Sequence, residues 1–212
     1  MTPSELAEYA RRQYNAVGDA FFSDPELYQY IWAAQLELAT EALCIRRVYT
    51  ASTVAAQQEY EYPTNALSIK RVTYDGEKLT PITFREEDAL TSPAVTVSGS
   101  PQYYAVWNDT LYLTPIPDAV GTLKIFSINE PQEVDNTSVL EVPTRYHLKM
   151  ADFLLAAMCA KEKNFQAAGH YQARWDKTVM DAKKQERKYL RGDAFLGVND
   201  SESMASNVLG SS

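Results

Sequence analysis

The longest regular pattern in the sequence is an apolar stripe that runs from Pro143 to Leu190. Its members recur at steps of mostly three and four residues, which is the period of one helix face. They are Tyr146, Met150, Leu154, Ala157, Phe165, Ala168, Tyr171, Trp175 and Val179. Because Asn164 interrupts the pattern, we predict two successive helices, 144–163 and 164–189. A helix is stabilised mainly by packing its apolar stripe, so this segment needs other helices to lie against.

Two further helices are predicted at the N-terminus. The segment Thr2–Glu5 is a capping box with proline at the first helical position, and it predicts a helix that ends at Gly18. The segment Ser23–Glu26 starts a second helix in the same way, with an end near Ile45. Its apolar residues also follow the helical period, so it is the natural packing partner of the helix at 144–163.

From Arg46 to Asn129 the apolar pattern changes to that of strands. Tyr, Thr and Val replace Leu and Ala, and apolar residues alternate with polar ones. Strands are predicted at 47–53, 57–62, 66–74, 78–82, 103–107, 110–114 and 122–128, and a short helix at 83–90. Asp75-Gly76 is a strong hairpin signal, and Asn108-Asp109 is a weaker one. A change in the phase of alternation near Lys70 predicts a β-bulge.

The order of these patterns predicts an α+β fold, a helical bundle with an inserted antiparallel β domain and an extended C-terminal tail. The predicted divisions are 1–45 for the N-terminal helices of the bundle, 46–129 for the β domain, 130–142 for a linker, 143–190 for the long C-terminal helices and 191–212 for the tail. The total length of 212 residues fits one or two domains.

The tail differs from the rest of the chain in composition. Residues 191–212 hold three glycines and five serines, a composition that predicts disorder in isolation. Its apolar residues are nevertheless spaced like anchors in an extended peptide, which predicts that the tail becomes ordered on a partner. The residues expected to make this contact are Arg191, Asp193, Phe195, Leu196, Val198, Met204, Val208 and Leu209.

The balance of charge argues against a protein that grips nucleic acid. The chain has 28 acidic and 20 basic residues, a net charge of −8, whereas phosphate binding needs an excess of Lys and Arg. An acidic chain is compatible with a duct through which DNA slides, because like charges prevent adhesion.

No sequence signature of catalysis or of metal binding is present. A Gly-rich phosphate loop, a nucleophile elbow and a zinc-ligand cluster are all missing, so no catalytic residue, metal or cofactor is predicted.

His147 and His170 lie far apart and are expected at the surface or at an interface. Cys44 and Cys159 are expected to be small buried thiols in a reducing compartment. The N-terminus lacks a signal peptide and 153–160 is too short to span a bilayer, so no membrane partner is expected.

Four features occur together in the chain. They are the helix from Asp24 to Ala39, the segment Tyr62-Pro63 with Leu67–Val72 and Asp75–Leu79, the pair Tyr103–Val106 and Leu111–Pro117, and Val142-Pro143 ahead of the long helices. Together they resemble the head-to-tail adaptor proteins of short-tailed bacteriophages, which are also described as tail tubular or portal-binding connector proteins. The stretch from Leu190 to Phe195 is similar to the ends of some members.

The resemblance implies a structural virion protein, not an enzyme, in the neck or tail of a virion and assembled in the host cytoplasm. Such proteins form a ring, usually of twelve copies, beneath the portal. They link the portal to the tail nozzle or another tail protein, and they continue the channel through which duplex DNA passes without specific binding. In related proteins the C-terminal segment reaches into the portal, so the portal is the expected partner of the tail.

A long helix of mixed charge suits the heterologous contact of a closed ring. The residues expected at this ring interface are Arg174, Asp176, Lys177, Asp181, Lys184 and Arg187. Arg46 and Arg47 are likewise expected to pair with acids of a neighbouring copy.

Two other functions remain open at this point. The sequence has 14 tyrosines, and the pairs Tyr60/Tyr62 and Tyr103/Tyr104 are of a kind that stacks on sugars or bases, or that lines the two faces of a strand. One alternative is therefore a carbohydrate-binding or hydrolytic tail module built on the tyrosine-rich β domain. The other is a general helical scaffold without a viral role.

Overall fold

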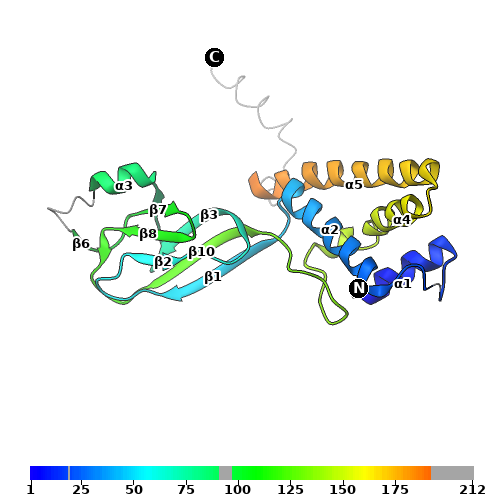
Figure 1. Ribbon diagram of the computed structural model, residues 1–212. Helices are drawn as coiled ribbons and strands as arrows, with labels where there is room; N and C mark the ends of the chain where they lie inside the picture. Colours follow the sequence, from blue (N-terminus) through cyan, green and yellow to red (C-terminus); the bar gives the residue numbers. More distant parts are fainter. Residues whose placement is uncertain (19, 91–96, 192–212) are drawn as a thin grey trace, which may run out of the picture.

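The chain has an α+β fold with a helical part and a β part (Figure 1). The computed structural model describes residues 1–18, 20–90 and 97–191. The helical part contains α1 (Pro3–Tyr14), α2 (Asp24–Ala42), the 3-10 turn η1 (Thr144–Tyr146), α4 (Met150–Lys161) and α5 (Phe165–Arg191). The β part contains α3 (Phe84–Leu90), β1 (Arg46–Ser52), β2 (Glu59–Glu61), β3 (Ala66–Tyr74), β4 (Glu77–Lys78), β5 (Thr80–Pro81), β6 (Ser98–Gly99), β7 (Tyr103–Trp107), β8 (Thr110–Thr114), β9 (Ile116–Pro117) and β10 (Thr122–Asn129). The predicted fold class is confirmed, but all of the predicted tail after its first residue lies outside the described residues.

The first helix is capped as the sequence predicts. The backbone N–H of Glu5 donates to Thr2 Oγ1 over 3.2 Å, and the backbone N–H of Thr2 donates to Glu5 Oε2 over 2.8 Å. The predicted end at Gly18 is wrong, because α1 already ends at Tyr14. The next residue, Asn15, takes the left-handed conformation with φ 60°, which terminates a helix.

Left-handed residues also follow α2 and α4. Leu43 has φ 56°, so α2 stops at Ala42, before the predicted end near Ile45. The predicted break at Asn164 is confirmed, since Lys163 has φ 63° and Asn164 Oδ1 accepts a hydrogen bond from the N–H of Ala167. Residues 144–146 form a 3-10 turn and residues 147–149 a further turn, so the regular helix begins later than predicted.

The β part consists of two four-stranded sheets and one small two-stranded sheet. The first sheet has the order β1-β10-β3-β4, and the second has the order β2-β8-β7-β5. Buried side chains of the β part form one core, separate from that of the helices. This core contains Tyr60, Val72, Tyr74, Leu79, Tyr104, Leu111, Leu113, Leu123 and Ile125.

The predicted turns and the predicted bulge of the β part are confirmed. Asp75 and Gly76, with φ 48° and 93°, join β3 to β4, and Asn108 with φ 52° lies in the turn from β7 to β8. In the β10–β3 ladder Phe126 pairs with Arg71 while Ser127 pairs with Ile69, which leaves Lys70 as the extra residue of a bulge.

Two details of the strand prediction are wrong. The run 78–82 is not one strand, because β4 pairs with β3 of the first sheet and β5 pairs with β7 of the second. Leu79, which is 1% exposed, lies between them in the β core, so the chain crosses from one sheet to the other at this residue. The sequence pattern also missed the short parallel pair of β6 and β9.

The two ends of the β part lie side by side. β1 follows α2 and β10 precedes η1, and the two strands pair antiparallel with Arg46 opposite Ile128. The N–H of Asn129 also donates to the carbonyl of Ile45 over 2.9 Å. The chain therefore leaves the helices and returns to them at one place, which is the geometry of an insertion. That residues 46–129 act as a separate domain stays a prediction.

Helix α5 packs one face on the rest of the helical part. Trp175 and Ala182 are fully buried, and Val179 is buried between them along the same face. The indole N–H of Trp175 donates to Glu37 Oε2 of α2 over 2.8 Å. The ring of Trp175 also packs edge-on against Phe153 of α4, with centroids 5.5 Å apart. These contacts fix α5 across α2 and α4.

A buried carboxylate joins the end of α5 to the β part. Glu186 is 1% exposed, and its Oε2 lies 2.8 Å from Arg46 Nη2, at the start of β1. Its Oε1 pairs with the guanidinium of Arg145 in η1 and accepts a hydrogen bond from the hydroxyl of Tyr146 over 3.1 Å. The two guanidinium groups also lie over the ring of Tyr189. We call this set of side chains the Glu186 cluster; it holds three segments at the point where the β part begins.

Replacement of Glu186 is expected to destabilise the protein. The Glu186→Gln variant keeps the shape of the side chain but removes the charge that faces two guanidinium groups. Because hydrogen bonds to charged groups contribute more than neutral ones, we expect a loss of about 2 kcal/mol in the free energy of unfolding, measured in urea. Asp181→Asn, a matched change at an exposed site of the same helix, should stay within about 0.5 kcal/mol of the wild type. Equal effects of the two changes would contradict a structural role for the cluster.

Candidate assembly surfaces

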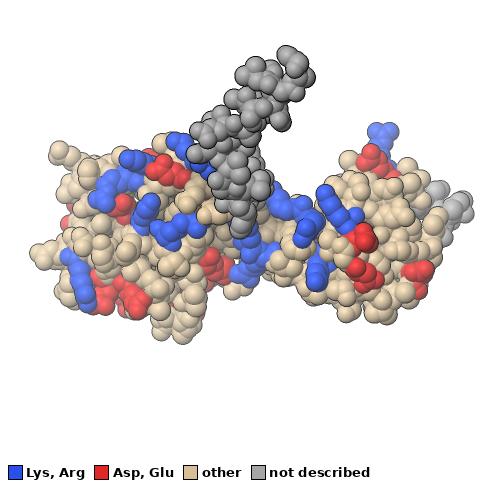
Figure 2. Space-filling model, turned by 180° about the vertical axis from the view of Figure 1, so that it is seen from behind, with Lys and Arg blue, Asp and Glu red and all other residues tan. Residues whose placement is uncertain are grey.

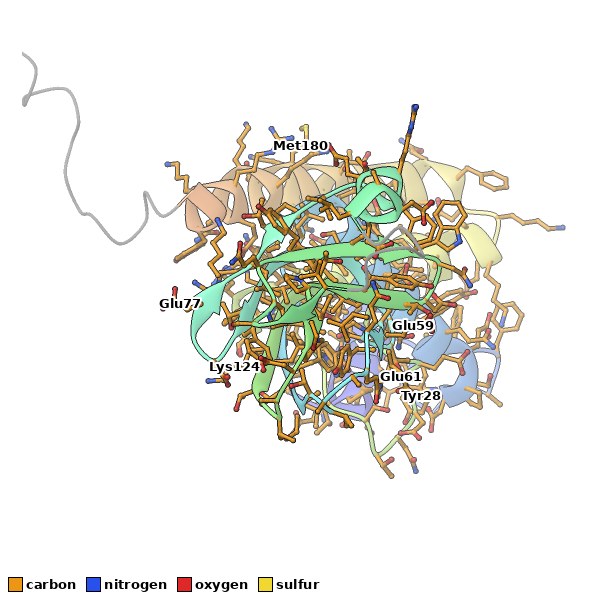
Figure 3. All side chains as sticks on the ribbon, turned by 90° about the vertical axis from the view of Figure 1, so that its left-hand side faces the viewer. Tyr28, Glu59, Glu61, Glu77, Lys124 and Met180 are labelled. Atoms are coloured by element: carbon orange, nitrogen blue, oxygen red, sulfur yellow. The ribbon has the colours of Figure 1, made fainter. Side chains whose placement is uncertain are left out.

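The face of α5 that points away from the protein core is exposed along much of its length. Lys177, Met180 and Lys184 lie on this face at helical spacing, and the Met180 side chain is 57% exposed. Figure 3 shows Met180 at the upper edge of the molecule. Seen from behind, Lys and Arg side chains gather along the upper side of the helical part (Figure 2). We call Lys177, Met180, Lys184 and their exposed neighbours the α5 outer face.

The residues predicted for the ring interface are all exposed and all lie on α5. They are Arg174, Asp176, Lys177, Asp181, Lys184 and Arg187. Two of them already have partners in the same chain, since Arg174 lies 3.1 Å from Asp152 of α4 and Asp176 accepts a hydrogen bond from Gln172. The other four form no ion pair within the described part of the chain. Their role in a ring stays a prediction.

The pairing expected for Arg46 and Arg47 is different in the structure. Arg46 binds Glu186, and Arg47 lies 2.8 Å from Glu141 Oε1, at the end of the segment that returns to the helices. Both acids belong to the same chain, so these arginines hold the β part to the helical part. The charge pattern located the cations correctly, but it did not identify their partners.

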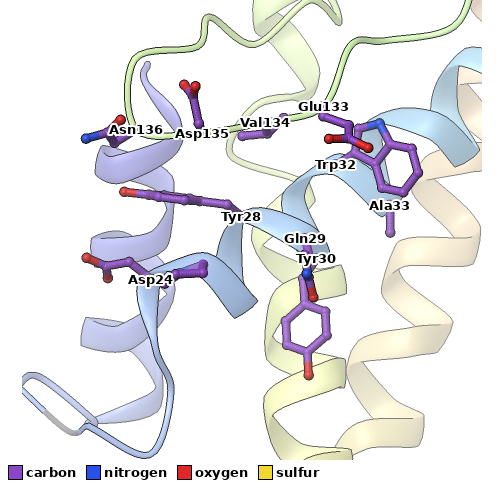
Figure 4. Close-up of a pocket in the computed structure, with 11 residues that line it drawn as sticks. Asp24, Tyr28, Gln29, Tyr30, Trp32, Ala33, Glu133, Val134, Asp135 and Asn136 are labelled. Carbon is purple, nitrogen blue, oxygen red and sulfur yellow. The ribbon is translucent and has the colours of Figure 1, made fainter.

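A groove of about 880 Å³ lies between α2 and the segment that follows β10 (Figure 4). Its lining residues are Asp24, Pro25, Tyr28, Gln29, Tyr30, Trp32, Ala33, Glu133, Val134, Asp135 and Asn136. Tyr28 and Trp32, one turn apart on α2, provide aromatic surface, and Val134 lies across from them. The indole Nε1 of Trp32 is buried and has no acceptor among the described residues. We call this site the α2 groove.

Negative charge is concentrated beside the α2 groove. Glu133 and Asp135 are exposed, and neither forms an ion pair within the described ranges. Asp135 Oδ1 accepts hydrogen bonds from the backbone and hydroxyl groups of Thr137 and Ser138, which lowers the pKa of Asp135 to about 2. The carboxylate is therefore charged at neutral pH. Asp24 is also at the groove, but its charge is paired with Arg11 over 2.6 Å.

The β part exposes an aromatic cluster. The Trp107 side chain is 60% exposed and stacks on Phe84 of α3, with ring centroids 5.0 Å apart and planes at 24°. Tyr112 packs edge-on against the same Phe84 ring. An exposed cluster of this kind is typical of a surface that contacts another protein.

The tyrosines considered for sugar binding are mainly structural. Tyr60 and Tyr104 are buried in the β core, and the Tyr60 hydroxyl bonds to the backbone of Val54 and Gln57. Burial also raises the pKa of Tyr62 and of Tyr104. The two pairs of tyrosines do not form an open stacking platform, which removes the main reason for the carbohydrate-binding alternative.

The expectation that His147 lies at the surface or at an interface is wrong. Its ring is 6% exposed, its Nε2 lies 2.8 Å from the carbonyl oxygen of Val142, and burial lowers its pKa. His170 is exposed, as expected.

Within residues 1–18, 20–90 and 97–191, no three His, Cys, Asp or Glu side chains gather at a site that would hold a metal ion. No helix in the described ranges has the length and apolar character needed to cross a membrane.

Most of the residues predicted to contact the portal lie outside the described residues. Arg191 is the last residue of α5. The others are Asp193, Phe195, Leu196, Val198, Met204, Val208 and Leu209. Because α5 ends beside the Glu186 cluster, the predicted tail begins near the junction of the helical and β parts.

The family model described as SU10 adaptor protein matches residues 1–195. The chain belongs to the SU10 adaptor protein family. The match spans the helical part, the β part and the first residues after α5, and it agrees with the resemblance to head-to-tail adaptors found in the sequence motifs. A search of curated proteins gives no match. This adaptor is thus a structural component of a phage virion, and its exposed surfaces are better candidates for function than any catalytic site.

Both cysteines of the adaptor are buried free thiols, as the sequence predicts. Burial and the nearby charge of Glu186 raise the pKa of Cys44 to about 11, and burial raises the pKa of Cys159. Because the thiolate is the reactive form, we expect a water-soluble maleimide to leave the folded protein unlabelled at neutral pH. The same reagent in urea should label both positions. Rapid labelling of either thiol before unfolding, detected by mass spectrometry, would contradict this assignment.

Proposed function

We propose that the protein is a head-to-tail adaptor that forms a ring beneath the portal, links it to the tail nozzle or another tail protein, and continues the DNA channel. The observation that carries this proposal is the family match over residues 1–195. A ring of twelve copies is the expected size, from the resemblance to other adaptors. The role is structural and requires neither catalysis nor a cofactor, and the site of action is the neck of the virion after assembly in the host cytoplasm.

Three separate surfaces are available for the three kinds of contact that such an adaptor makes. The α5 outer face is the candidate for ring formation, since it is exposed and rich in charge. The aromatic cluster around Trp107 is the candidate for the distal tail protein, because it is exposed and belongs to the β part. The tail after Arg191 is the candidate for the portal, and its anchor-like apolar residues support this assignment.

Removal of the tail tests the contact with the portal. A chain that ends at Arg191 should fold, because the helical core and the β core lie entirely before that residue. It should nevertheless fail to bind purified portal rings in sedimentation or mass photometry. A matched full-length control replaces Ser201 and Ser203 by Ala, which keeps the apolar residues and should bind like the wild type. Undiminished attachment by the truncated chain would refute the assignment of the tail.

The proposed channel leads to a prediction about DNA binding. The chain has 28 acidic and 20 basic residues, and Arg46, Arg47 and Arg174 are already paired inside the chain, so the protein has no excess of cations to neutralise phosphates. Weak repulsion and no base readout would let duplex DNA slide during ejection. We expect the adaptor to bind duplex DNA weakly, with little salt dependence. A protein that neutralised Z phosphates would instead show a log–log slope of about −0.9Z, and such a slope in a fluorescence titration would contradict the proposal.

A further inference from the structure

The α5 outer face and the α2 groove lie on opposite sides of the helical part. Figure 3 shows Met180 at the upper edge of the molecule and Tyr28 at the lower edge. Figure 1 shows the same separation, since α5 forms the top of the helical part and the loop after β10 lies at the bottom. Two unlike surfaces on opposite sides of a subunit are what a closed ring requires, because each copy uses one surface toward each neighbour.

The two surfaces complement each other in charge. The α5 outer face presents two lysines, Lys177 and Lys184, and one neighbouring acid, Asp181, and none of them forms an ion pair among the described residues. The α2 groove is flanked by the acids Glu133 and Asp135, which also form no ion pair there. Opposite charges that are left unpaired within one chain favour contact between copies, while two identical surfaces would repel each other.

The two surfaces also have apolar side chains that can pack on each other. Met180 lies between the two lysines on the helix surface and is 57% exposed, although its side chain is apolar and flexible. The α2 groove offers the aromatic rings of Tyr28 and Trp32, and methionine sulfur makes favourable contacts with aromatic rings. The buried indole N–H of Trp32 has no hydrogen-bond acceptor among the described residues, whereas buried donors normally have one. This suits a groove in which another protein supplies the acceptor.

We propose that the α5 outer face of one copy docks in the α2 groove of the next copy, with Met180 over Tyr28 and Trp32 and with Lys177 and Lys184 beside Glu133 and Asp135. This inference rests on the proposed ring and names its interface. It assigns a contact to four exposed groups of opposite charge and to one exposed methionine that the isolated chain leaves without a role.

Site-directed cross-linking tests the contact in rings assembled on portal. One variant carries both Met180→Cys and Ala33→Cys, because Ala33 lines the α2 groove. A short bismaleimide should join the copies into a ladder of oligomers on a denaturing gel. A control variant carries Met180→Cys and Val120→Cys, since Val120 is 72% exposed but belongs to the β part. The control should give no ladder, and the two native cysteines are buried and should not react.

Charge reversal tests the same contact without cysteines. Lys177→Glu with Lys184→Glu should lower the yield of complete rings by about tenfold or more, because like charges then face each other. Adding Glu133→Lys should restore a large part of the yield. Asp135 is kept, since its hydrogen bonds hold the turn. Lys124→Glu, a reversal at an exposed site of β10, is the matched control and should assemble like the wild type.

The outcomes separate this inference from the proposed function. A ladder with the Ala33 pair and rescue by Glu133→Lys support the inference. Complete wild-type rings on portal, without a ladder and without an effect of the double lysine reversal, overturn the inference and leave the proposed function intact. A wild-type protein that forms no ring on portal in electron micrographs overturns the proposed ring, and the inference with it.

Discussion

The arrangement of the whole molecule depends on one buried carboxylate. Glu186 is removed from solvent, and the cost of burying its charge, several kcal/mol for an unpaired ion, is offset by Arg46, Arg145 and the hydroxyl of Tyr146. These three partners come from the start of β1 and from η1, whereas Glu186 comes from the last turns of α5. A salt bridge with this geometry favours one orientation of the β part on the helices, because another orientation would remove Arg46 from the buried carboxylate.

The Glu186 cluster also determines where the assembly surfaces lie. It fixes the end of α5 at the junction, while the face of α5 that carries Met180 stays exposed. The second ion pair at the junction, between Arg47 and Glu141, attaches the segment that leads from the α2 groove into η1. Arg46, Arg47 and Arg145 are thus paired within the chain at the junction, whereas Lys177 and Lys184 on α5 and Glu133 and Asp135 beside the groove are left for contacts with other proteins.

The sequence predicted the architecture well, because periodicity and capping are local properties. The two long helices, their break at Asn164 and the hairpin at Asp75-Gly76 all follow from residues close to one another in the chain. Predictions that needed tertiary information were less successful. The end of α2 depended on Leu43 accepting a left-handed conformation, which its residue type does not indicate, and His147 is polar by type but buried beside the carbonyl of Val142.

The candidate surfaces could be predicted only in part, for the same reason. The charged residues of α5 were identified from the sequence, but the acids that pair with Arg46 and Arg47 are distant in the chain and could not be deduced from spacing. The α2 groove was missed because Tyr28 and Trp32 appear in the sequence only as a wider apolar stripe of α2.

The most direct test of the account is an electron cryomicroscopy map of the adaptor bound to its portal. The account predicts a closed ring in which α5 of each copy contacts α2 of the next. Adaptor copies that bind the portal without touching one another through their helical parts would contradict it.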